Sequence, residues 1–129
     1  MGQQQLLLIV LGVIIVGIAV VVGINLFNAN ASEANRDGVV SDLNNLGAMA
    51  QQSYKKPASM GGGANTFTGW AATIPANLLT TANGTYVPAV QAQSVTIVGT
   101  GKEPGRNTAN PVQCTATILP ASITVVVNN

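Results

Sequence analysis

An uninterrupted apolar segment over residues 6–27 restricts the fold of this chain more than any other feature. Its 22 residues include no charged side chain and only one strongly polar side chain, Asn25. As an α-helix the segment spans roughly 33 Å, which matches the hydrocarbon core of a bilayer. The residues predicted to pack against neighbouring apolar groups are Leu6, Leu7, Ile9, Val10, Val13, Ile14, Val16, Ile18, Val20, Val21, Ile24 and Phe27.

The residues that follow the apolar segment do not require the helix to end at residue 27. No proline occurs before Pro57, so one continuous helix is permitted from about residue 3 to about residue 54. Such a helix is roughly 78 Å long, which exceeds the diameter of any domain that a chain of this size can build. We therefore expect its apolar half to be covered by groups outside its own subunit.

Three glycines lie in the apolar segment, at positions 12, 17 and 23. Small residues let helix backbones approach each other closely in lipid or in a bundle. Gly17 and Gly23 also fit a second interpretation, in which the helix bends or loosens under packing strain. The sequence leaves both interpretations open.

The second half of the helix is amphipathic. Its apolar residues recur at spacings of three and four, opposite a face rich in Ser, Asn and Gln. This periodicity predicts a stripe that covers one face of a sheet. The stripe includes Val39, Leu43, Leu46, Ala50 and Tyr54. The first charges of the chain, Glu33, Arg36 and Asp37, have the spacing of ion pairs on a helix surface.

The rest of the chain predicts a small antiparallel β domain. Glycines 61–63 indicate a flexible connection, residues 66–70 a short strand and residues 75–79 a turn of helix. Residues 86–98 predict one strand, mainly in the part after Pro88, and alternation at 112–118 and 123–127 predicts a C-terminal hairpin. The expected fold is α+β: a long N-terminal helix, residues 1–56, packed on an antiparallel sheet of three to four strands within residues 57–129.

The composition excludes several classes of function. Only 7% of the residues are charged, the net charge is +1, there is no histidine, and Cys114 is the single cysteine. We therefore expect no nucleic-acid partner, no disulfide, no Cys/His metal site and no cofactor. The four acidic residues, at 33, 37, 42 and 103, offer no nucleophile–base pair or carboxylate dyad, so we expect no enzyme.

An apolar N-terminal helix that runs unbroken into an amphipathic half covering a small antiparallel sheet resembles a type IV pilin. The family has an acidic side chain at the fifth mature position, and the matching residue here is Gln5 if Met1 is the first mature residue. A glutamine can accept a hydrogen bond from a neighbouring N-terminal amine but loses most of the charge contribution. The Gly2-Gln3 step also resembles the glycine-before-glutamine cleavage sites of archaeal pilins and archaellins.

The resemblance implies a major pilin, a structural subunit that polymerises with many identical copies into an extracellular filament on the cell surface, a class of structure that includes adhesive fimbriae. It also implies residence in the cytoplasmic membrane before assembly, a prepilin peptidase and a pilus assembly machinery. A head-to-tail interface that does not close generates such a helical filament. Two alternatives remain: a pseudopilin of a secretion system, and a single-pass membrane-anchored surface domain that binds a ligand.

Two short motifs match the N-glycosylation pattern, with acceptors Asn30 and Asn83. The first acceptor is usable only if its helix face is exposed. Both are therefore candidate modification sites on an extracellular protein.

Overall fold

The computed structural model describes residues 2–129 and divides the chain into two compact units. The first unit ends at Ala31, and the second runs from Ser32 to Asn129. The division expected from the sequence separates the helix, residues 1–56, from the sheet domain, residues 57–129. The compact units divide the helix itself, because its amphipathic part buries side chains against the sheet and so belongs to the second unit.

Helix α1 (Gly2–Lys55) confirms the predicted continuous helix. Residues 2–31 of the helix belong to the first unit and include the apolar segment. Its part in the second unit carries all the buried residues of the helix, which are Arg36, Val39, Leu43, Leu46, Gly47 and Ala50. Lys55 lies in the last turn, where a positive charge interacts favourably with the helix dipole.

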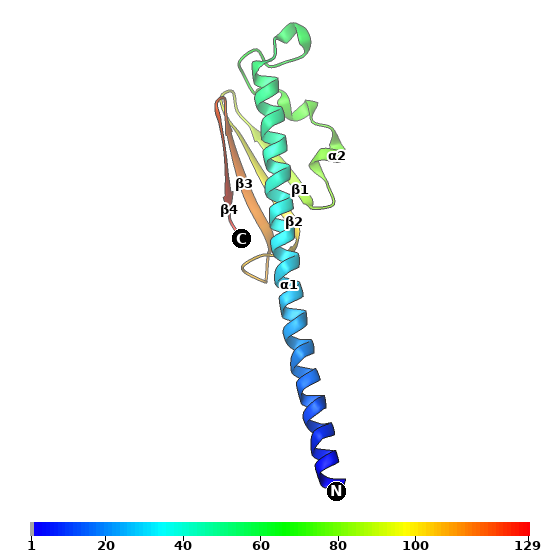
Figure 1. Cartoon of the computed structure of the whole chain (residues 1–129). Helices are drawn as coiled ribbons and strands as arrows, with labels where there is room; N and C mark the ends of the chain where they lie inside the picture. The colour runs from blue at the N-terminus through cyan, green and yellow to red at the C-terminus, as the bar shows by residue number, and fades with distance from the viewer. Residues whose placement is uncertain (1) are drawn as a thin grey trace. The chain divides into compact units, whose positions relative to one another are not determined.

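Four antiparallel strands form a meander in the second unit and lie along one side of the part of α1 that belongs to this unit (Figure 1). They are β1 (Gly84–Val90), β2 (Val95–Pro104), β3 (Pro111–Leu119) and β4 (Ser122–Val127), hydrogen-bonded in that order. The predicted C-terminal hairpin is confirmed, with Ala116 opposite Val125 and Ile118 opposite Ile123. The α+β fold with a helix packed on an antiparallel sheet is therefore confirmed.

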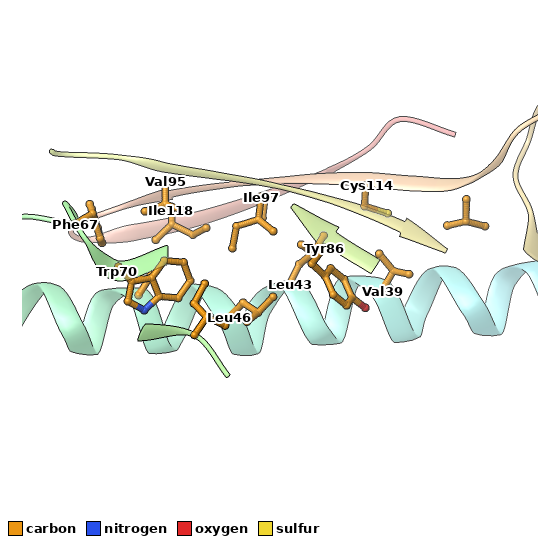
Figure 2. Close-up of a cluster of buried hydrophobic side chains, with 14 residues drawn as sticks. Val39, Leu43, Leu46, Phe67, Trp70, Tyr86, Val95, Ile97, Cys114 and Ile118 are labelled. Carbon is orange, nitrogen blue, oxygen red and sulfur yellow. The ribbon is translucent and has the colours of Figure 1, made fainter. Parts of the chain in front are cut away.

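The hydrophobic core of the second unit lies between the helix and one face of the sheet. Figure 2 shows helix side chains facing strand side chains across this layer, with the aromatic residues Phe67 and Trp70 at one end. Alternation along each strand produces this face: Val95 and Ile97 of β2 are fully buried, while Thr96 between them is not. The fully buried strand residues are Val95, Ile97, Val112, Cys114, Ala116 and Ile118.

The prediction of one strand over residues 86–98 is wrong, because this region contains most of β1, the turn after it and the first four residues of β2. Pro88 lies inside β1, opposite Ile97. Because β1 is an edge strand, it tolerates a residue that has no backbone N–H to donate. The chain turns at residues 91–94, where the Gln91 N–H donates to the Ser94 carbonyl (2.8 Å).

The prediction of a strand over residues 66–70 is also wrong. The region forms turns that lead into a 3₁₀ helix, Trp70–Thr73, and a single backbone hydrogen bond joins Phe67 to the Ala92 carbonyl (3.0 Å). A second 3₁₀ helix, Ala58–Met60, follows α1. The predicted helical turn is confirmed as α2 (Ala76–Leu79).

The glycine-rich loop after α1 is a helix cap, which corrects the expected flexible connection. The N–H of Gly63 donates to the Ser53 carbonyl (2.8 Å), and the N–H of Asn65 donates to the Tyr54 carbonyl (2.8 Å). These contacts satisfy carbonyls that the end of a helix leaves without intrahelical partners. Gly63 is required by space, because a Cβ there would lie 1.9 Å from the Thr66 carbonyl oxygen.

Candidate assembly surface

The apolar segment of α1 exposes large hydrophobic side chains on every side of the helix. Among the described residues, 17 of the 21 exposed large hydrophobic side chains lie within residues 6–27. Their exposed fractions run from 52% at Ile14 to 76% at Phe27. All twelve residues predicted to pack in a filament core are in this set. By length and composition, this helix is long and apolar enough to cross a membrane.

Such exposure is unfavourable in water. Burying a Val, Leu or Ile side chain completely contributes about 1.5–3 kcal/mol. More than half of the surface of each side chain is exposed here, and burying that exposed part would contribute roughly 1–1.8 kcal/mol per side chain. The 17 side chains together represent an upper bound of roughly 15–30 kcal/mol. A helix that is apolar all round is normally buried in protein or in lipid.

The remaining sequence-predicted residues of this segment also lie in α1. Gln5 is exposed in the second turn. Gly17 and Gly23 are α-helical, so the helix is not loosened at either position in this structure. A Cβ at either glycine would meet nothing within 4 Å, so each glycine leaves a shallow notch on the exposed surface of the helix.

The stripe predicted to pack on the sheet is found in the second unit. Val39, Leu43 and Ala50 are fully buried and Leu46 is 3% exposed. Tyr54 is half-buried, and its ring lies 4.7 Å from that of Phe67 while its hydroxyl donates to Gln93 Oε1 (2.9 Å). Tyr54 therefore covers the loop that carries Phe67 and the β1–β2 turn.

Asp42 joins α1 to the segment that leads into β1, which the sequence did not indicate. Its Oδ2 accepts hydrogen bonds from Thr81 Oγ1 (2.8 Å), Asn83 Nδ2 (3.1 Å) and the Tyr86 hydroxyl. Burial by itself would raise the pKa of the Asp42 carboxyl, but the three hydrogen bonds outweigh it and the pKa lies below its ordinary value. Burial and the contact with Asp42 raise the pKa of Tyr86.

Asn35 makes a second polar connection between the helix and the sheet. Its Nδ2 donates to the Asn83 carbonyl (2.7 Å), and its Oδ1 accepts from the N–H groups of Lys102 (3.0 Å) and Glu103 (3.2 Å). A Cβ on Gly101 would lie 2.1 Å from this oxygen, so glycine at position 101 makes room for the contact.

Arg36 is 9% exposed, which corrects its predicted place on the helix surface. Position 36 is three residues before Val39 and seven before Leu43, so it belongs to the buried stripe. The predicted ion pair with Glu33 is present, but Nε of Arg36 is buried with no hydrogen-bond partner in residues 2–129. Burial raises the pKa of the Cys114 thiol, and the positive charges of Arg36 and Arg106 offset this only in part.

The two glycosylation motifs have different environments. Asn30 is exposed on α1. Asn83 is half-buried, and the nitrogen to which a glycan is attached is the one that donates to Asp42. A glycan replaces one of the two hydrogens on this nitrogen, so the hydrogen bond to Asp42 is kept only if the other hydrogen donates it.

No group of three or more His, Cys, Asp or Glu side chains placed to hold a metal ion occurs within residues 2–129. Comparison of the chain with protein-family models, with curated proteins and with solved structures gave no match. The fold and the exposed segment define a general class: an α+β protein whose N-terminal helix is long and apolar enough to cross a membrane.

Proposed function

We propose that this chain is a structural subunit of a helical extracellular filament and, more narrowly, a subunit of the type IV pilin kind. The observation that carries the proposal is the contrast within helix α1. Its residues 36–50 include side chains buried against the sheet, whereas the large hydrophobic side chains of residues 6–27 are all exposed within the described residues 2–129. Many identical copies of the apolar segment can cover one another, because each presents the same surface on all sides.

In this proposal residues 6–27 lie in lipid before assembly and form the filament core afterwards. The sheet domain forms the outer surface. The notches at Gly12, Gly17 and Gly23 support close packing of helix backbones, since side chains of a neighbouring helix can occupy them. Gln5 offers an amide oxygen to the N-terminal amine of a neighbouring copy. A prepilin peptidase and an assembly machinery would process and export the chain.

The test compares two valines of similar exposure. Val16 in the apolar segment is 62% exposed, and Val126 on β4 is 56% exposed. In the filament core, Val16→Asn loses apolar burial and brings in an amide without partners, which costs about 2–4 kcal/mol per subunit. The control Val126→Asn changes a surface position by no more than about 0.5 kcal/mol.

The wild-type chain and both variants are purified in detergent, and the detergent is then removed. We expect regular thin filaments by negative-stain electron microscopy for the wild type and for V126N, and their loss for V16N. Soluble monomers of the wild type after detergent removal, or filaments that V16N leaves unchanged, contradict the proposal. Short assemblies that stay with membranes favour a pseudopilin, and monomers that insert singly into vesicles favour an anchored binding domain.

A further inference from the structure

The face of the sheet that points away from the helix ends in a hollow that no charged side chain lines. Its volume is about 350 Å³, within the range of small-molecule sites. Its wall comes from β2, from β3, from the loop at 105–110 and from the residues after β4. We call it the amide pocket, and the residues that matter for its chemistry are Thr100, Asn107, Asn110, Gln113, Asn128 and Asn129.

Asn129 holds the wall of the amide pocket in place. Its Oδ1 accepts from the N–H of Asn107 (2.6 Å), and its Nδ2 donates to the carbonyls of Asn107 (3.3 Å), Asn110 (3.1 Å) and Pro111 (3.0 Å). Its backbone N–H also donates to the Gln113 carbonyl (3.1 Å). The loop is therefore fixed before any ligand arrives, which lowers the entropic cost of binding.

Several polar groups of the pocket are left for a ligand. Within residues 2–129, the side-chain amides of Asn110 and Gln113 and the hydroxyl of Thr100 make no hydrogen bond. Gln113 and Thr100 are directly opposite each other on β3 and β2, and both are half-buried. Each amide offers two N–H donors and a carbonyl acceptor, and the hydroxyl adds one donor and two acceptor sites.

The chemistry of these groups selects the class of ligand. No charged side chain lines the pocket, so its side chains offer no opposite charge to a phosphate, a carboxylate or a metal ion. No aromatic or large aliphatic side chain lines it either, so it does not suit an apolar ligand. Each hydroxyl of a sugar ring is both a hydrogen-bond donor and an acceptor. A side-chain amide can accept from one hydroxyl through its oxygen and donate to the neighbouring hydroxyl through its nitrogen. We propose that the amide pocket binds neutral saccharides.

The sheet surface beside the pocket also offers groups that can contact a saccharide. Thr96, Thr117 and Thr124 stand in one row across β2, β3 and β4, and Thr115 pairs with Val126 in the next row. These two rows are therefore uncharged and rich in hydroxyls and methyl groups. If the chain polymerises as proposed above, each subunit presents one pocket, and a weak single site gains about 10²–10⁴ in avidity on a polysaccharide.

The test uses the full chain in a zwitterionic detergent, because sugar-headed detergents would compete for the pocket. Maltohexaose, cellohexaose, chitohexaose and mannohexaose are titrated to about 20 mM, where weak single sites are measurable. Side-chain amide signals are followed by NMR. We expect saturable shifts at Asn110 and Gln113 with at least one of the four probes. Asn110→Ala and Gln113→Ala should each weaken binding about tenfold, because each removes a hydrogen-bonding partner.

Asn44→Ala is the matched control, because Asn44 is an exposed side-chain amide on α1 outside the pocket. It should bind like the wild type. The emission of Trp70, which is 3% exposed, shows that each variant is folded. Absence of saturable shifts with all four probes overturns the proposal, and so does binding that N110A, Q113A and N44A leave equally intact. The measurement uses dispersed chains, so failure to form filaments does not affect it.

Discussion

Replacing Asp42 with asparagine tests how strongly one carboxylate fixes α1 to the segment before β1. In the wild type, Asp42 accepts three hydrogen bonds, from Thr81, Asn83 and Tyr86. A hydrogen bond to a charged group contributes about 1.5–3 kcal/mol, and one between neutral groups about 0.5–1.5 kcal/mol. Changing three bonds from the first kind to the second costs up to about 3–4 kcal/mol. Because Asp42 is only half-buried, solvent screening reduces this to about 1–2 kcal/mol.

Urea unfolding followed by the emission of Trp70, the one tryptophan of the chain, measures this loss in the second unit. With a slope of about 1–1.5 kcal/mol per molar urea, D42N should lower the midpoint by roughly 0.7–2 M at pH 7. The exposed Asp37 lies on the same helix and makes no hydrogen bond to other elements within residues 2–129. Asp37→Asn is therefore the control and should leave the midpoint unchanged.

The pH dependence gives a second readout. The folded-state pKa of Asp42 is lower than its ordinary value of 3.8, so the carboxylate stabilises the fold fully above that pH. This stability is lost as the pH falls through the folded-state pKa, and the difference between wild type and D42N should shrink below about pH 4. Equal midpoints for wild type and D42N at pH 7, or a difference that persists unchanged at low pH, would refute the reasoning.

Two further changes test the core and the helix cap by the same urea assay. Leu43→Ala removes a fully buried side chain and should lower the free energy of unfolding by about 2–5 kcal/mol, and a loss below 1 kcal/mol would contradict the helix–sheet packing. Gly63→Ala should cost about 2 kcal/mol, because its Cβ would meet the Thr66 carbonyl. The Cβ of Gly12→Ala would meet nothing, and alanine favours the helix, so this change should not lower the midpoint; equal midpoints for both variants would contradict the cap.

Periodicity was enough to predict the helix and the C-terminal hairpin. In α1 the apolar residues change from continuous to a stripe of spacings three and four, and the structure buries Val39, Leu43, Leu46 and Ala50 of that stripe. In the hairpin the period of two places Cys114 and its alternating neighbours on one face. Such patterns are local, because each residue's environment follows from its neighbours in the chain.

The errors concern contacts between distant parts of the chain. The hydrogen bonds of Asp42 join residues 39 to 44 positions apart, and no local pattern encodes them. Three consecutive glycines, 61–63, predicted a flexible connection. Their composition does not indicate that the loop donates hydrogen bonds to the last carbonyls of the helix. Arg36 is a different case: its position on the stripe was visible, but a charged residue is rarely buried, so its charge was given more weight than its spacing.

The amide pocket could not be predicted from the sequence either, because it too depends on contacts between distant residues. Asn107, Asn110 and Asn129 are ordinary polar residues in the sequence, in a loop and near the last strand. They form a cavity only because the β3–β4 register brings residue 129 beside Gln113. The apolar segment needs no such register, since every side of the helix is apolar. The exposed apolar segment could therefore be predicted from the sequence, whereas a cavity lined by neutral side chains required the positions of the strands.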